Sequence, residues 1–188
     1  KPYPIGLLNI GPVEICIDMV RRDKVDADSI ERIEVTTYRE AVHFVGKYTT
    51  PESSYIDCYL SLPYCIAVSL YDGMLGVEQL EEHRVRDHKV HDLARRVTFS
   101  EDPQMSARYP HEWPVAITVQ LRGGGRVSRR VDQVKWSPRR PPSWDELIEK
   151  FLLLAEPVIG RERAEHTIDF AARLEQAQDM APLMDLVR

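Results

Sequence analysis

The chain has 188 residues, 43% of them hydrophobic and 29% charged, as expected for an ordinary globular domain with one well-buried core. Its net charge of −5 argues against a nucleic-acid-binding or membrane-surface protein. No uninterrupted apolar run reaches the length of a transmembrane helix, so we expect neither a membrane nor a nucleic acid as partner.

The first half of the chain alternates helical and strand-like patterns. Gly11-Pro12 precedes apolar residues at helical spacing, which predicts a helix over residues 12–22. The β-branched stretch Ile30–Tyr38 predicts a half-buried strand. Residues 46–59 are polar and rich in turn formers, which indicates a loop. The segment Leu62–Tyr71 is apolar nearly all round and precedes Asp72-Gly73, which predicts a buried helix with a glycine stop.

The second half continues with short elements. Its patterns predict a surface helix over Asp87–Arg96 with Val90, Leu93 and Ala94 turned inward, a strand from Val97, a hairpin of Val115–Leu121 with Val127–Val131, and two C-terminal helices. Ser143 and Glu146 form a capping box for the first of these two helices, Pro157 is expected to end it, and Arg161–Gln176 forms the second.

The order of these elements predicts an α+β fold. We expect a single domain over residues 1–188, built as a two-layer sandwich with a mainly antiparallel sheet and helices packed on one face. The hairpin should share its sheet with Ile30–Tyr38, and Leu62–Tyr71 should be among the most buried segments.

Several suggestive patterns have ordinary explanations. The three glycines at 123–125 fit a hairpin turn, because neither a G-K-[ST] sequence nor a helix follows them. His88 and His91 share a helix face, but without an evident third ligand we expect a solvated face and no metal site. The basic run at 129–142 resembles a solvated loop. An odd number of widely spaced cysteines, Cys16, Cys58 and Cys65, predicts a reduced cytoplasmic protein.

Two stretches remain as candidates for a functional site. In Lys1-Pro2-Tyr3-Pro4 the prolines restrict the backbone, so that Lys1 is presented on a stiff, extended arm. In Ser61-Leu62-Pro63-Tyr64 the proline suits the first turn of a helix, which places Tyr64 near a helix N-terminus, where an anion is favoured. On chemistry alone, a charged end residue and a core tyrosine are the simpler interpretations of Lys1 and Tyr64.

Taken in order, the motifs resemble one known family. The stretches "KPYP", "SLPYCIAVSLYDG", "DHKVHDLARRVTF", a hairpin and "PPSWDELIEKFLLLAE" resemble the second, C-terminal lid domain of the MmgE/PrpD family. This family includes 2-methylcitrate dehydratase, cis-aconitate decarboxylase and iminodisuccinate epimerase. The resemblance covers about residues 1–155, and residues 156–188 are expected to form C-terminal helices.

The resemblance implies an enzyme of the lyase class. It implies a dehydratase or decarboxylase acting on a small di- or tricarboxylate such as 2-methylcitrate or cis-aconitate, held between this lid and a helical N-terminal domain of the same protein. Lys1 and Tyr64 match the catalytic lysine and tyrosine, and we assign Tyr3 and Ser61 to substrate binding. We expect no cofactor and no metal, a cytoplasmic homodimer, and no activity from this chain alone.

The sequence also departs from the family pattern. Family members commonly carry a histidine a few residues after the lysine, whereas residues 5–10 contain none, and Leu60 replaces the usual phenylalanine before Ser61. An isomerase or epimerase of the same family begins with the same proton abstraction and is the alternative activity. A non-catalytic ligand-binding or dimerising α+β module is the alternative from another class.

Overall fold

The structure is a computed structural model that describes residues 1–187. The chain divides into two compact units, Lys1–Arg140 and Pro141–Arg188. Each unit is described by itself below. Within the described residues, no helix has the length and apolar content needed to cross a bilayer.

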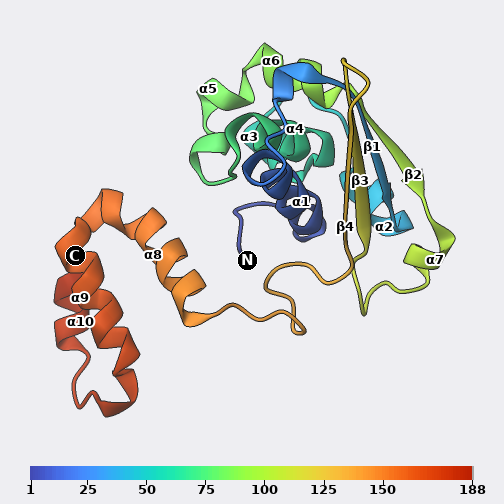
Figure 1. Cartoon of the computed structure of the whole chain (residues 1–188). Coiled ribbons are helices and arrows are strands. Elements are labelled where there is room, and N and C mark those ends of the chain that lie inside the picture. Colours follow the sequence, from blue (N-terminus) through green and yellow to red (C-terminus); the bar gives the residue numbers. More distant parts are fainter. Residues whose placement is uncertain (188) are drawn as a thin grey trace. The chain divides into compact units, whose positions relative to one another are not determined.

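A four-stranded sheet is the centre of the first unit (Figure 1). Its strands are β1 (Ile30–Thr37), β2 (Val97–Glu101), β3 (Val115–Leu121) and β4 (Arg126–Val131), in the order β2-β1-β3-β4. β1 runs parallel to β2, whereas the β1–β3 and β3–β4 pairs are antiparallel. The predicted α+β class and the hairpin that shares a sheet with the first strand are therefore confirmed.

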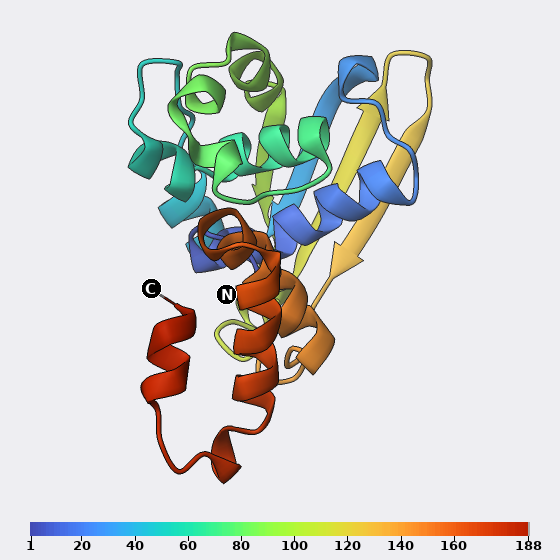
Figure 2. The same ribbon diagram turned by 90° about the vertical axis from the view of Figure 1, so that its left-hand side faces the viewer.

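Helices cover one face of this sheet (Figures 1 and 2). The helices of the first unit are α1 (Ile10–Arg21), α2 (Arg39–Val45), α3 (Tyr55–Leu60), α4 (Leu62–Asp72), α5 (Glu82–Val85), α6 (His88–Ala94) and α7 (Pro103–Ser106). α1 and α4 pack against each other. Their apolar side chains meet those of the inward-facing strand residues, such as Ile33 and Ile117, in one core. This is the predicted two-layer arrangement.

The helix α4 is the most enclosed element of the first unit. Every residue from Leu62 to Leu70 is buried, as its nearly continuous apolar sequence predicts. Gly73 ends the helix with φ of +63°, a left-handed conformation that glycine adopts without steric cost. The predicted buried helix and its glycine stop are both confirmed.

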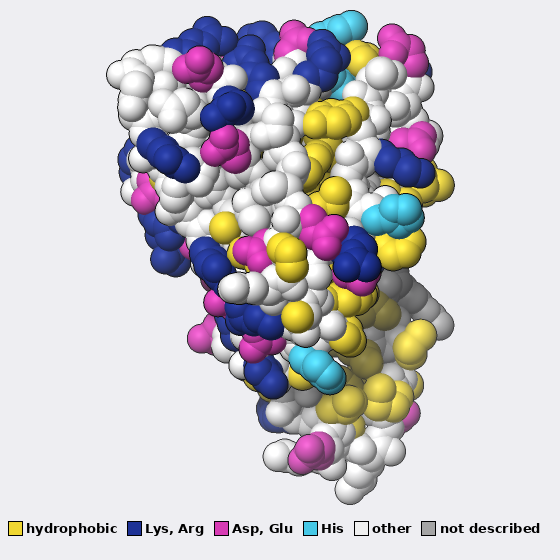
Figure 3. Space-filling model, turned by 90° about the vertical axis from the view of Figure 1, so that its right-hand side faces the viewer, with side chains coloured by type: hydrophobic (Ala, Val, Ile, Leu, Met, Phe, Trp, Pro, Cys, Tyr) yellow, Lys and Arg dark blue, Asp and Glu magenta, His cyan; other side chains and the backbone are white. Residues whose placement is uncertain are grey.

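The opposite face of the sheet is polar. Hydroxyl pairs link neighbouring strands there, with Thr36 Oγ1 2.9 Å from Ser100 Oγ and Thr118 Oγ1 2.8 Å from Ser128 Oγ. Figure 3 views the molecule from this side and shows basic and acidic side chains interspersed over the surface. The alternation of apolar and polar residues along β1 and β3 thus separates the core from solvent.

The structure corrects two boundaries. Residues 46–59 were expected to be a loop, but Tyr55–Leu60 form the helix α3, which begins with a capping box of Ser54 and Asp57. Pro157 was expected to end a helix, but α8 (Trp144–Ile159) continues two residues beyond it. A proline so close to a helix end removes only one hydrogen bond, and Gly160, with φ of +80°, supplies the stop.

The second unit consists of helices alone. It contains α8, α9 (Arg161–Ala172) and α10 (Ala181–Leu186), and Ser143 and Glu146 form the predicted capping box of α8. Among its described residues only Ala164 and Thr167 are buried, so its amphipathic helices leave much apolar surface exposed.

Candidate functional site

The first part of the candidate site is the side chain of Lys1. Its Nζ donates hydrogen bonds to the carbonyl oxygen of Ile5 at 3.0 Å and to the hydroxyl of Tyr59 at 2.9 Å. The same nitrogen lies 5.5 Å from the centroid of the Tyr59 ring, within the range of a cation–π contact. The lysine arm is therefore held against the C-terminal end of α3.

Backbone contacts fix this arm in place. The carbonyl oxygen of Tyr59 accepts hydrogen bonds from the backbone N–H of Gly6 and from Nδ2 of Asn9, both at 3.3 Å. Asn9 is buried and also donates to Sγ of Cys65 at 3.5 Å. The K-P-Y-P arm thus meets the junction of α3 and α4 at Tyr59, a residue that no periodicity or motif in the sequence singled out.

Ser61 caps α4 from within the protein. Its Oγ accepts the backbone N–H of Tyr64 at 3.2 Å and donates to the carbonyl oxygen of Lys47 at 2.6 Å. Ser61, Leu62 and Pro63 are all buried. The N–H groups expected to face an anion at this helix N-terminus are therefore enclosed by the protein in this structure.

Tyr64 is buried in the core. Its hydroxyl donates to the carbonyl oxygen of Gln79 at 2.7 Å, and its ring lies 5.6 Å from the ring of His91. Burial raises the pKa of its phenol well above the usual range, so the hydroxyl stays protonated and serves as a donor. The structure places Tyr64 next to Ser61, and its hydroxyl is used within the protein.

Tyr3 is half-buried and packs against the core. Burial raises the pKa of its phenol, and the nearby carboxylates of Glu14 and Asp18 raise it further. Of the four residues assigned to the site from the sequence, Lys1 alone lines the cavity described next; Tyr3, Ser61 and Tyr64 do not.

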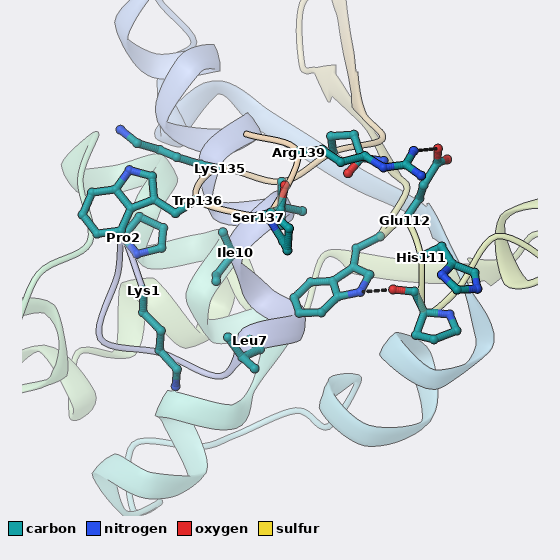
Figure 4. Close-up of a pocket in the computed structure, with 15 residues that line it drawn as sticks. Lys1, Pro2, Leu7, Ile10, His111, Glu112, Lys135, Trp136, Ser137 and Arg139 are labelled. Atoms are coloured by element: carbon teal, nitrogen blue, oxygen red, sulfur yellow. Dashed lines mark hydrogen bonds and ion pairs between the residues drawn. The ribbon is translucent and has the colours of Figure 1, made fainter. Parts of the chain in front are cut away.

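A cavity of about 450 Å³ lies beside Lys1 and belongs entirely to the first unit (Figure 4). This volume lies within the usual range for a small-molecule site. Lys1 and Pro2 lie on one side of the cavity, and His111 and Glu112 on the other (Figure 4). Its lining residues are Lys1, Pro2, Leu7, Ile10, Pro110, His111, Glu112, Trp113, Gln133, Val134, Lys135, Trp136, Ser137, Pro138 and Arg139.

Positive charge exceeds negative charge in this lining. It contains the three cationic side chains of Lys1, Lys135 and Arg139 and one carboxylate, that of Glu112. The carboxylate of Glu112 is paired with Arg139 at 3.2 Å and with Arg108. The apolar walls strengthen the attraction of these cations for an anion, because they reduce its solvation by water.

The wall formed by residues 133–139 is anchored to α1. Oε2 of Glu14 accepts the backbone N–H of Lys135 at 3.0 Å, and Oε1 accepts from Arg140 at 2.7 Å. Trp136 has φ of +64°, an uncommon conformation for a residue with a bulky side chain. The sequence had indicated a solvated loop here, but Val134 is buried and the segment forms one side of the cavity.

Metal ligands do not gather in the part of the chain that the structure describes. Residues 1–187 contain no group of three histidine, cysteine, aspartate or glutamate side chains placed to hold a metal ion. The chemical groups in the cavity lining include ammonium and guanidinium groups, a carboxylate, an amide, an imidazole, a serine hydroxyl and two indole rings.

Fold and cavity together describe an α+β domain with a small, basic, partly apolar cavity. The family model of the MmgE/PrpD C-terminal domain matches residues 3–176. The chain therefore belongs to the MmgE/PrpD family and corresponds to its C-terminal domain. The match extends beyond Ala155 into the second unit, whereas Lys1 and Pro2 precede it.

Curated relatives support this assignment. The chain is 26% identical to cis-aconitate decarboxylase of Mus musculus over 162 residues, which are 86% of this chain and 32% of that protein. It is 28% identical to 2-methylcitrate dehydratase of Salmonella typhi over 160 residues, 80% of this chain and 33% of that protein. The chain thus spans about a third of the length of the curated relatives it matches.

Proposed function

We propose that this chain is the C-terminal domain of a lyase that acts on a small di- or tricarboxylate such as 2-methylcitrate or cis-aconitate. The observation that carries the proposal is the cavity beside Lys1, whose lining contains three cationic side chains, one carboxylate and apolar walls. The cationic lining would attract a substrate with two or three carboxylates.

Lys1 has the central role in this proposal. Its ammonium group binds a substrate carboxylate or donates a proton to the leaving group. Tyr64 and Ser61 support the site by fixing the start of α4, because their polar atoms are engaged with Gln79 and Lys47. Tyr3 supports the arm that carries Lys1 by packing against the core.

The reaction class follows from the chemistry of such substrates. In the dehydratase reaction, a proton next to a carboxylate is removed and the neighbouring hydroxyl group takes up a proton and leaves as water. In the decarboxylase reaction, a carboxylate leaves as carbon dioxide and the carbon that keeps the electron pair takes up a proton. The relatives are named for these two activities, which favours a lyase. An epimerase of the same family is the second candidate, since its reaction also begins with removal of a proton next to a carboxylate.

The proposal also includes a second domain of the same protein and a second copy of that protein. The chain spans about a third of its relatives' length, which supports a helical N-terminal domain that completes the site. We also propose a cytoplasmic homodimer. Size-exclusion chromatography with light scattering of the protein as its gene encodes it tests the oligomeric state.

The test of function is an assay of the protein as its gene encodes it. Citrate, 2-methylcitrate and cis-aconitate are supplied in turn, and alkene absorbance is followed. We expect turnover of at least one acid, and Lys1→Ala should lower the rate by orders of magnitude while leaving the melting temperature nearly unchanged. Lys89→Ala, at an exposed position of α6, is the matched control and should retain the full rate. If none of these acids binds or reacts, the proposal is wrong.

A further inference from the structure

We propose that Tyr59 is the phenol that binds a substrate carboxylate together with Lys1. This inference rests on the proposed function and assigns a substrate-binding residue beside Lys1; Tyr59 is not itself among the residues that line the cavity. Its basis is the direct contact between the two side chains, with Lys1 Nζ 2.9 Å from the Tyr59 hydroxyl and 5.5 Å from the ring centroid.

The hydrogen-bonding capacity of the phenol supports this assignment. Its oxygen accepts a hydrogen from Lys1, and its own O–H can still donate one hydrogen bond. Among residues 1–187, no side chain or carbonyl group accepts that hydrogen. A carboxylate next to the pair would offer one oxygen to the phenol and one to the ammonium group, which gives a two-point, charge-assisted contact.

The position of Tyr59 is fixed before a ligand arrives. Its carbonyl oxygen is held by Gly6 and Asn9, and α3 begins at a complete capping box. The side chain of Tyr59 is half-buried, and its hydrogen bond with Lys1 lies at an exposed position that a ligand can reach. Such pre-organisation reduces the entropy lost on binding.

Tyr64 differs from Tyr59 in each of these respects. Tyr64 has no exposed surface, and its O–H is donated to Gln79 at 2.7 Å. To contact a substrate it would have to break that hydrogen bond and leave the carbonyl oxygen of Gln79 without it, which is costly in a buried position. The geometry therefore assigns the ligand contact to the tyrosine that lies five residues earlier.

The test compares Tyr59→Phe with the unsubstituted protein as its gene encodes it, using the acid that reacts best. Phenylalanine keeps the ring beside Lys1 and removes the O–H donor. We expect KM to rise about tenfold, the effect of losing one hydrogen bond to a charged group, with kcat little changed. KM does not depend on the concentration of folded enzyme, so a partial loss of folding does not imitate this result.

Tyr55→Phe is the matched control. Tyr55 lies one turn earlier on α3 and is exposed, and its substitution should leave KM unchanged. If Tyr59→Phe leaves KM unchanged while Lys1→Ala abolishes turnover, this inference is overturned and the proposed function remains. A fall in kcat at unchanged KM also overturns it, because Tyr59 would then act in the chemical step. If the unsubstituted protein acts on none of the acids, the proposed function fails and this inference fails with it.

Discussion

Asp23 and Arg129 form an ion pair that joins residues 106 positions apart in the sequence. Arg129 on β4 donates from Nε to Oδ2 of Asp23 at 2.6 Å and from Nη2 to Oδ1 at 2.9 Å. This two-point geometry is the strongest form of a guanidinium–carboxylate contact. It connects the chain just after α1 to the edge strand of the sheet.

The hydrogen bond from Arg129 lowers the pKa of the Asp23 carboxyl below its usual value. The pair therefore stabilises the fold at pH values above the pKa of the unfolded chain, and this contribution is lost as the pH falls through the lower folded value. We predict that Asp23→Asn lowers the free energy of unfolding by about 1 kcal/mol at neutral pH and by less at about pH 3, below the ordinary pKa of an aspartate. Urea unfolding at the two pH values measures the difference.

Glu31→Gln is the control for this prediction, since Glu31 is an exposed carboxylate on β1. It should change stability by less than about 0.5 kcal/mol at either pH. An equal loss of stability for Asp23→Asn at both pH values would show that the side chain acts through packing and not through its charge.

At the same scale, Lys1 could be singled out from the sequence but Tyr59 could not. Two prolines beside Lys1 restrict the backbone, and that signal is local. The position of Tyr59 depends on its hydrogen bonds with Gly6 and Asn9, which lie near it only in the folded chain. Trp113 and Arg139 likewise could not be singled out from the sequence, because they line the cavity from separate segments of the chain. The contact between Arg139 and Glu112 brings these segments together in the fold.

Helix α6 shows how a surface pattern can hide a buried polar residue. His91 was expected on a solvated face with His88, but it has no exposed surface. Its Nε2 lies 2.7 Å from the carbonyl oxygen of Val85, and its Nδ1 lies 3.0 Å from that of Thr49. The imidazole thus ties α6 to the end of α5 and to the loop before α3.

We predict that His91→Ala lowers the free energy of unfolding by about 3 kcal/mol, because it removes a packed ring and leaves two buried carbonyl groups without it. His88→Ala, on the exposed side of the same helix, should cost less than about 0.5 kcal/mol. Chemical denaturation of the two variants measures both values. Similar losses for the two substitutions would contradict the structural role assigned to His91.

Elements with a strong local signal were predicted correctly. Three local patterns predicted the structure that is observed: the continuous apolar run of α4, the alternation of apolar and polar residues in β1 and β3, and the Ser143–Glu146 capping box. The helix α3 was missed because its six residues show little periodicity. Its Ser54–Asp57 capping box was the available signal. His91 was misplaced because its partners come from other segments.

At the scale of the whole molecule, the cavity supplies only part of what the proposed lyase reaction needs. The lining comes entirely from the first unit and contains three cations, one paired carboxylate and the imidazole of His111. The second unit leaves large apolar side chains exposed, among them Trp144 and Leu154. Both observations, together with the length of the relatives, favour a site that other parts of the protein complete.

We therefore predict that the 188-residue chain folds by itself but shows no measurable turnover of citrate, 2-methylcitrate or cis-aconitate. Folding should follow from the shared core of α1, α4 and the sheet, and circular dichroism with thermal melting should show a cooperative transition. Turnover should be absent because catalytic groups must be held within about half an ångström of productive geometry. In a chain that begins at Lys1, the α-amino group also adds a second cation beside Nζ. The same assay on the protein as its gene encodes it is the control, and robust turnover by the 188 residues alone would place the complete active site within them.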